Sequence, residues 1–265
     1  MEQKVVVYTS LVEADTQLII CGIRLANLFK KELCLFYQAS KAFHDTSIDT
    51  RLKKYRDLIR QDVPDLPVSI LISSIKGEKL AVKLADENEA IILVAESSDF
   101  GKLAVSLRNS PIPFLFIDGK IPFLSDFRKV IFPVDLRHQN QDAMKWVLYF
   151  GKHNHSEIIA IGANDKVKAN QRQVTALLWS LKKMMTKSGV SLKIIKGTRS
   201  SLGIHNEGLA AALQFQADLL ILLGSSTITI LDLLIGLPEE KMIKRAAGLP
   251  VLVVNPRRET YLVCE

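Results

Sequence analysis

The sequence repeats itself at a separation of about 125 residues, and this repetition constrains the fold more than any other feature. Residues 4–10 and 129–135 each begin with lysine and continue as an apolar run that is typical of a buried strand. The same separation relates residues 32–36 to 157–161, so the segment between the two strands has one length in both copies. Self-similarity over so long a period predicts two domains of one architecture.

Three further pairs of apolar segments recur in the same order, at separations of 122, 128 and 137 residues. Each half is therefore expected to contain five strands. The increase from 128 to 137 places nine additional residues in the second half, between its fourth and fifth strands. The paired segments are 68–70 with 190–192, 89–95 with 217–223, and 113–117 with 250–254.

Helical patterns separate these strands. Residues 15–31 carry apolar side chains at spacings of three and four after Asp15, a helix start signal, and residues 141–152 repeat the arrangement. Continuous apolar strands alternating with helices predict parallel sheets covered on both faces, because parallel strands need crossover connections. The fold class is therefore α/β, with two tandem doubly wound five-stranded parallel-sheet domains. We expect them to span residues 1–120 and 126–258.

Composition agrees with a globular protein, since 48% of the 265 residues are hydrophobic and 24% are charged. No apolar run approaches the roughly 20 residues of a membrane-spanning helix, and the first residues do not resemble a signal peptide. Cys21, Cys34 and Cys264 are too few and too far apart for a disulfide framework, and we interpret them as inert. A cytoplasmic location is the expectation.

The net charge is +7 and the isoelectric point is about 9.2, which would suit an acidic partner. The charges are dispersed along the sequence, however. The densest cluster, residues 51–60, is interpreted as the solvated face of a helix whose apolar stripe is formed by Leu52, Tyr55, Leu58 and Ile59. Because no zinc-finger, helix-turn-helix or RNA-binding pattern is present, we expect no nucleic-acid partner. We expect no membrane partner either.

Ligands of doubly wound sheets sit outside the carboxyl ends of the strands, where the chain direction reverses. In the second half the first strand ends at Asp135, and the fourth continues into residues 224–227, which are glycine, two serines and threonine. A carboxylate opposite a loop of small residues suits a nucleotide, because Asp135 could accept hydrogen bonds from ribose or adenine and the loop amides could meet phosphates. The alternative is structural: aspartate and Gly-Ser-Ser also form caps and turns.

Three segments resemble the universal stress protein family in its tandem form. They are the strand at 129–135, the strand and turn at 217–225, and the ending at 246–254. The resemblance covers nearly the whole chain. It implies two domains of the adenine nucleotide alpha hydrolase-like, universal stress protein-like fold, a role in the stress response and association as a homodimer.

Members of this family that bind ATP share an aspartate after the first strand and a loop of pattern Gly-x2-Gly-x9-Gly-[Ser/Thr]. Asp135 and Gly224 match this pattern, whereas Thr227, Leu237 and Pro238 stand where the second glycine, the third glycine and the hydroxyl are expected. The loop therefore looks degenerate, with ATP or AMP bound weakly if at all. The candidate ligand-binding residues are Asp135, Gly224, Ser225, Ser226, Thr227 and Gly236.

The first half departs further from the family pattern. Its first strand ends in Ser10 instead of aspartate, and its fourth strand is followed by Glu96 and Asp99, whose carboxylates would repel phosphates. The nine missing residues correspond to the phosphate loop, so residues 101–110 are expected to pass directly into the last helix. We interpret this half as a scaffold or partner surface.

Catalytic chemistry has little support in the sequence. His153 and His155 are two residues apart near a helix end and make a poor metal pair, while His138 and His205 have no nucleophile or acid partner at motif spacing. Trp179, within a helical pattern at 174–187, is predicted to be a core residue, and an apolar partner surface is the alternative. We expect no enzyme, no catalytic residue and no metal site.

The favoured reading is a non-catalytic universal stress protein that acts through contacts with an unknown protein partner or as a small-molecule sensor. One alternative is a module that binds ATP or AMP in the cleft of the second half. The other is a carrier or sensor of a non-nucleotide ligand.

Overall fold

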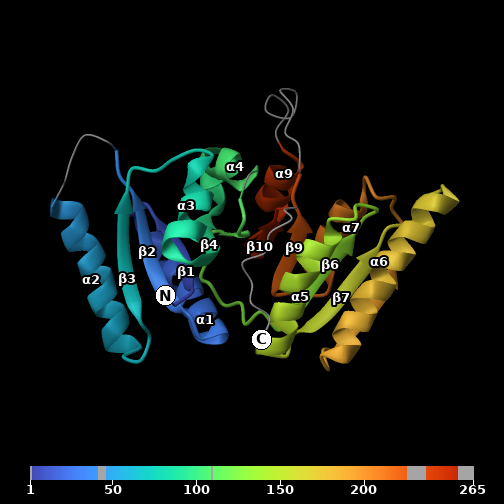
Figure 1. Ribbon diagram of the computed structural model, residues 1–265, viewed down its shortest axis with the longest axis horizontal. Coiled ribbons are helices and arrows are strands. Elements are labelled where there is room, and N and C mark those ends of the chain that lie inside the picture. The colour runs from blue at the N-terminus through green and yellow to red at the C-terminus, as the bar shows by residue number, and fades with distance from the viewer. Residues whose placement is uncertain (1, 41–45, 109, 226–236, 256–265) are drawn as a thin grey trace. The chain divides into compact units, whose positions relative to one another are not determined.

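The computed structural model describes residues 2–40, 46–108, 110–225 and 237–255. The chain separates into two compact units, Met1–Phe123 and Leu124–Glu265. Each unit is an α/β domain built on five parallel strands (Figure 1).

The first unit contains five parallel strands in the order β3-β2-β1-β4-β5. The strand β1 pairs with both β2 and β4, so it lies at the centre of the sheet. The elements are β1 (Lys4–Thr9), α1 (Asp15–Phe29), β2 (Glu32–Gln38), α2 (Thr46–Asp62), β3 (Val68–Ser73), α3 (Lys79–Asn88), β4 (Ala90–Glu96), η1 (Ser97–Asp99), α4 (Phe100–Arg108) and β5 (Phe114–Ile117).

The second unit has the same topology, with strand order β8-β7-β6-β9-β10. Here β6 is the central strand, between β7 and β9. The elements are β6 (Lys129–Val134), α5 (Asn140–Asn154), β7 (Glu157–Gly162), α6 (Lys168–Lys187), β8 (Leu192–Lys196), α7 (Ile204–Gln214), β9 (Leu219–Leu223), α9 (Pro238–Arg245) and β10 (Val251–Val254).

Burial on both faces explains why the inner strands are apolar without alternation. All five residues of β9 are buried, as are six of the seven in β4. The strand β8, at the end of its sheet order, has only intermediate and exposed residues. Central strands of a parallel sheet need apolar side chains on both faces, whereas a terminal strand does not. The predicted fold class, two doubly wound five-stranded parallel sheets, is confirmed.

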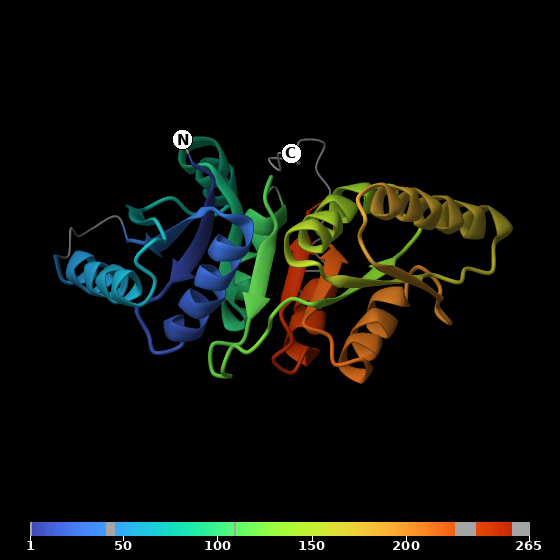
Figure 2. The same cartoon turned by 90° about the horizontal axis from the view of Figure 1, so that it is seen from below.

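Helices cover both faces of each sheet. In the second unit α5 contacts α6, and α7 contacts α9; Figure 2 shows α5 and α6 on one side of the strands and α7 on the other. Crossovers between parallel strands are right-handed, so the helices change face where the strand order changes direction. That change occurs between β1 and β4 in the first unit, and between β6 and β9 in the second. These two positions are where ligands of such sheets bind.

Two sequence predictions about helix faces are wrong. Trp179 was predicted in the core, but 63% of its surface is exposed, because the buried positions of α6 are Val174, Leu177, Leu181 and Met185. In α2, Leu58 was predicted on the apolar stripe, yet it is 48% exposed. Both side chains belong to an apolar helical pattern, but they lie outside the stripe that packs on the sheet. In the described part of the chain, no helix is long and apolar enough to cross a membrane.

The close approach of α1 to the sheet gives a test of the packing. A Cβ atom added to Gly22 would overlap the side chains of Val7 and Leu33, whereas one added to Gly101 in α4 would meet nothing within 4 Å. We expect Gly22→Ala to lower the free energy of unfolding by about 1–3 kcal/mol through overpacking. Gly101→Ala should raise it by up to about 1 kcal/mol, because alanine favours helix. Urea denaturation measures both; effects of equal sign would contradict this packing.

Candidate functional site

The candidate site lies at the carboxyl ends of β6 and β9, where the strand order of the second unit changes direction. Asp135 directly follows β6, and Gly224 and Ser225 directly follow β9. Since β6 and β9 are paired neighbours, the structure brings these three predicted residues to one edge of the sheet. The other predicted residues, Ser226, Thr227 and Gly236, lie outside the residues that the structure describes.

Asp135 is buried, with 3% of its surface exposed, and its carboxylate is held by three side chains of the same unit. Arg137 donates to it from its backbone N (2.8 Å, to Oδ1) and from Nε (2.6 Å, to Oδ2). Asn140 donates from Nδ2 to Oδ1 at 2.8 Å. His205 Nε2, at the start of α7, lies 3.3 Å from Oδ2. Both carboxylate oxygens therefore have partners within the protein.

Arg137 also bridges the two strand ends. Its Nη1 donates to the carbonyl oxygen of Gly224 at 2.9 Å, and its Nη2 donates to that of Leu223 at 3.1 Å. The same Nη2 lies 3.4 Å from His205 Nε2. The guanidinium group thus lies between the carboxyl ends of β6 and β9, the position where a doubly wound sheet receives its ligand.

These contacts determine the ionisation of Asp135. Burial by itself would raise the pKa of the carboxyl, but the hydrogen bond from His205 and the charge and backbone N–H of Arg137 outweigh it and lower the pKa to about 2. Asp135 is therefore an anion at neutral pH. Its charge is compensated by groups of its own chain.

The far side of the site is acidic as well. The Ser225 hydroxyl donates to Glu239 Oε1 at 2.7 Å, and Glu239 is buried in the first turn of α9. Leu237, which stands at a glycine position of the family pattern, is buried just before that turn. A carboxylate near the N-terminus of α9 satisfies the helix dipole in the way that a phosphate would.

A second buried aspartate fixes the neighbouring loops. Asp165, after β7, accepts hydrogen bonds from the backbone N of Ser201 (3.2 Å) and from its hydroxyl (2.5 Å). The Ser201 oxygen in turn accepts the backbone N–H of Leu136 at 3.0 Å. The loops after β6, β7 and β8 are therefore joined by hydrogen bonds, which restricts the conformations available to Arg137.

Sequence reasoning identified Asp135 but missed Arg137, Asn140 and the contact of His205. Arg137 and Asn140 are two and five residues from Asp135, so their proximity was a signal, but the direction of their side chains was not. His205 is 70 residues away, and only the pairing of strands in the sheet brings it close.

His138 is exposed, and His155 ends α5 with a left-handed φ of 51°. Within the described ranges, no group of three or more His, Cys, Asp or Glu residues could hold a metal ion.

The equivalent position of the first unit is occupied by acidic side chains. Asp15 begins α1, as predicted, and its carboxylate accepts the backbone N–H groups of Ser10, Leu11 and Val12. Glu96 accepts the N–H of Gly119 at 2.6 Å. Burial raises the pKa of both carboxyls, despite these hydrogen bonds.

Asp99, in η1, is buried and pairs with Lys102 at 2.6 Å. Helix α4 begins directly after it, as the shorter loop predicted. The carboxyl edge of this sheet therefore presents acids where a nucleotide would place its phosphates.

Cys21 and Cys34 are both buried. Burial raises the pKa of both thiols, that of Cys34 to about 11, so neither is a nucleophile at neutral pH. Cys264 lies outside the described residues.

Comparison with solved structures identifies the fold. A universal stress protein from Archaeoglobus fulgidus DSM 4304 is 15% identical, with a TM-score of 0.63, over 95% of this chain and 96% of that chain. A functionally unknown protein from Pseudomonas aeruginosa PAO1 is 12% identical, with a TM-score of 0.62, over 96% and 93%. The chain therefore has the universal stress protein fold in its tandem form, as the sequence predicted. No family model matches the sequence, and no curated protein matches it.

The lowered pKa of Asp135 predicts a pH-dependent stability. Because the folded-state pKa lies below the ordinary value, the ionised carboxylate stabilises the fold at neutral pH, and this stabilisation is lost as the pH falls from about 4 to about 2. The contribution is about 2 kcal/mol. The difference in the free energy of unfolding between the wild type and Asp135→Asn should shrink by this amount over that range.

Urea denaturation at a series of pH values measures this difference. Asp65→Asn, which removes an exposed carboxylate of the first unit, is the control for loss of one acid. A wild-type advantage over Asp135→Asn that does not change between neutral pH and pH 2 would contradict the assignment.

Proposed function

We propose that the protein is a non-catalytic universal stress protein that acts through contacts with other macromolecules, and that its second unit does not use ATP or AMP as a ligand. The observation that carries this proposal is the position of Arg137. Its guanidinium lies between the carboxyl ends of β6 and β9, bonded to Asp135, Leu223 and Gly224. The chain's own cation thus takes the place that a nucleoside would need.

The energies involved support this reading. A nucleotide that used Asp135 would have to displace Arg137 and leave a buried carboxylate without its main partner. Breaking a buried ion pair costs about 3–5 kcal/mol. Binding with millimolar affinity provides only about 4 kcal/mol. The displacement would therefore consume most of the free energy that a weak nucleotide site could supply.

The phosphate side of the site supports the same conclusion. Ser225 donates its hydroxyl to Glu239. A triphosphate beside the Glu239 carboxylate would meet a like charge in a partly dry environment, where repulsion is less screened. The first unit adds Glu96 and Asp99 at its own carboxyl edge, so we extend the proposal to both units.

Calorimetry with ATP, ADP and AMP in the presence of magnesium tests the proposal. We expect no saturable heat from the wild-type protein at millimolar nucleotide, because the crevice is occupied by Arg137. A saturable heat that disappears in Asp135→Ala would overturn the proposal. That result would establish the alternative, a nucleotide-binding module in the second unit.

Arg137→Ala shows whether Arg137 is the barrier. In this variant the Asp135 carboxylate keeps Asn140 and His205 but loses the side chain that crosses the crevice. Binding that is detectable in Arg137→Ala and undetectable in the wild type would assign the exclusion of nucleotide to Arg137. Arg245→Ala is the matched control, since this arginine donates to exposed Asn206 elsewhere in the same unit.

A further inference from the structure

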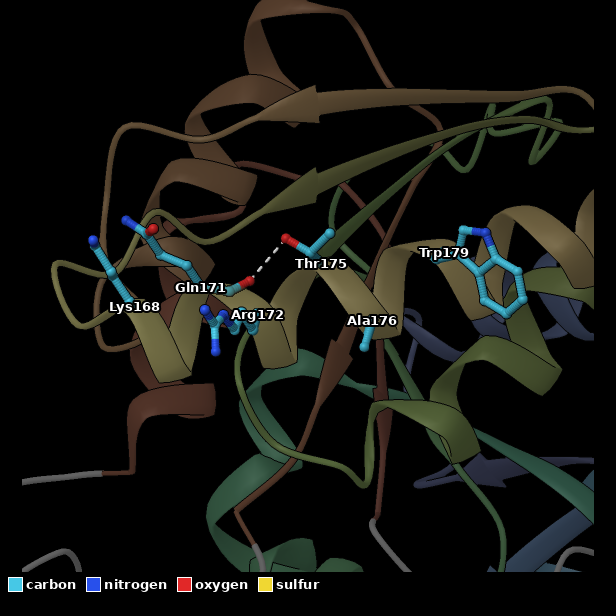
Figure 3. A pocket seen from close by; sticks show the side chains of 6 residues that line it. All are labelled: Lys168, Gln171, Arg172, Thr175, Ala176 and Trp179. Carbon is cyan, nitrogen blue, oxygen red and sulfur yellow. Dashed lines mark hydrogen bonds between the residues drawn. The ribbon is translucent and has the colours of Figure 1, made fainter.

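Helix α6 has an exposed face with a tryptophan at its centre. The buried residues of α6, Val174, Leu177, Leu181 and Met185, form one stripe. At 100° per residue, Trp179 lies nearly opposite that stripe and therefore points away from the sheet. Figure 3 shows it at one end of a row of side chains along this face. An indole that is 63% exposed is an unusual surface feature, because tryptophan is highly buried on average.

The charges of this face have one sign. The 20 residues of α6 include five Lys or Arg residues and no Asp or Glu. On the helical projection Lys168 and Arg172 lie on the N-terminal side of Trp179, and Lys182 and Lys183 lie on its C-terminal side. All four are exposed, and the ammonium of Lys183 is 5.5 Å from the centroid of the indole ring. The sequence spreads these charges over many positions, but the helix collects them around one aromatic ring.

Next to the indole, small side chains leave a hollow in the exposed face of α6. Thr175 and Ala176 line a hollow of about 620 Å³ together with Lys168, Gln171, Arg172 and Trp179. The Thr175 hydroxyl donates to the carbonyl oxygen of Gln171 within the helix, so its proton is not available to a partner (Figure 3). The charged groups around this hollow are all cations on long flexible stems.

Further exposed apolar side chains lie at the N-terminal end of α6. Val167, immediately before the helix, is 58% exposed, and Leu202 is 97% exposed. The loops that carry them are joined by the bond from Asn164 N to the carbonyl oxygen of Arg199 (2.7 Å) and by the Asp165–Ser201 hydrogen bonds. Single apolar side chains are therefore presented near lysines at both the start and the middle of the helix.

This combination suits a lipid surface better than a protein or a nucleic acid. Lysine is depleted in the cores of protein interfaces, yet lysines surround Trp179. Single-stranded nucleic acids are bound in basic grooves with several stacking aromatics, whereas α6 offers a single exposed indole. Anionic headgroups attract lysines without fixed register, and tryptophan is favoured at the boundary between headgroups and acyl chains.

We propose that the α6 face, defined by Lys168, Arg172, Trp179, Lys182 and Lys183, binds anionic lipid bilayers peripherally. The helix lies parallel to the membrane plane, the lysines contact the headgroups, and the indole of Trp179 enters the interface. The buried stripe of α6 stays on the sheet, so the unit does not have to unfold. This proposal goes beyond the proposed function and does not depend on whether a nucleotide binds.

Vesicle binding tests the proposal with the intact protein. Phosphatidylcholine vesicles with and without phosphatidylglycerol are titrated into the protein, and binding is measured by co-sedimentation and by tryptophan emission. The only other tryptophan, Trp146, is 3% exposed, so a blue shift on binding reports on Trp179. We expect binding and a blue shift only with phosphatidylglycerol, weaker at high salt. In Trp179→Phe the protein should still sediment with the vesicles, but without the blue shift.

Removing two positive charges from α6, or two from α2, distinguishes binding at the α6 face from attraction by the protein's overall net charge. Lys182→Ala/Lys183→Ala should weaken partitioning roughly 30-fold, because each lysine near an anionic surface contributes to binding. Lys53→Ala/Lys54→Ala, on α2 of the first unit, makes the same change in net charge and should leave partitioning nearly unchanged.

Four results would overturn the proposal. These are no binding to phosphatidylglycerol vesicles, equal binding to phosphatidylcholine alone, equal weakening by the two double variants, and binding of the wild-type protein without a blue shift. A blue shift with a single-stranded oligonucleotide or with polyglutamate, and none with vesicles, would also overturn it and would assign the face to nucleic acid or to an acidic protein. Thermal unfolding of each variant verifies that it is folded.

Discussion

The parallel pairing of strands is the constraint on which the rest of the structure depends. Parallel neighbours need crossover connections, the crossovers supply helices, and the helices bury both faces of each sheet. Only the strand ends and the outer faces of the helices then remain for contacts with other molecules. The ion pair of Asp135 with Arg137 lies in one of these regions, and the α6 face belongs to the other.

Asp135 illustrates how a carboxylate at the expected ligand-binding edge can be held by side chains of its own unit. Its carboxylate is buried, ionised and hydrogen-bonded, which are the properties of a ligand-binding acid. Every one of its partners, however, comes from the same chain. Arg137 also reaches the last carbonyl groups beside β9, so the ion pair joins two strands at the point where their connections diverge. An internal cation therefore joins the two strand ends at this edge of the sheet.

The two units reach a similar result with different residues. In the first unit Asp15 binds the backbone of its own loop and Glu96 binds Gly119, so acids take part in loop structure at the carboxyl edge. In the second unit a basic side chain is neutralised by a buried acid. Neither edge retains an unoccupied anion cradle among the described residues. The outward face of α6, where cations surround an exposed indole, carries a feature that internal packing does not use.

The sequence by itself determined the fold: apolar runs that recur in the same order predict five parallel strands per unit, and their ends predict where Asp135 and Gly224 meet. These are consequences of local pattern and of the regular geometry of parallel sheets. The tertiary structure decided which side chains complete the site, because the direction of Arg137 and the approach of His205 depend on contacts between distant segments. It also decided that Trp179 is outside, because α6 carries apolar residues on more than one side and only its packing against the sheet shows which side is buried.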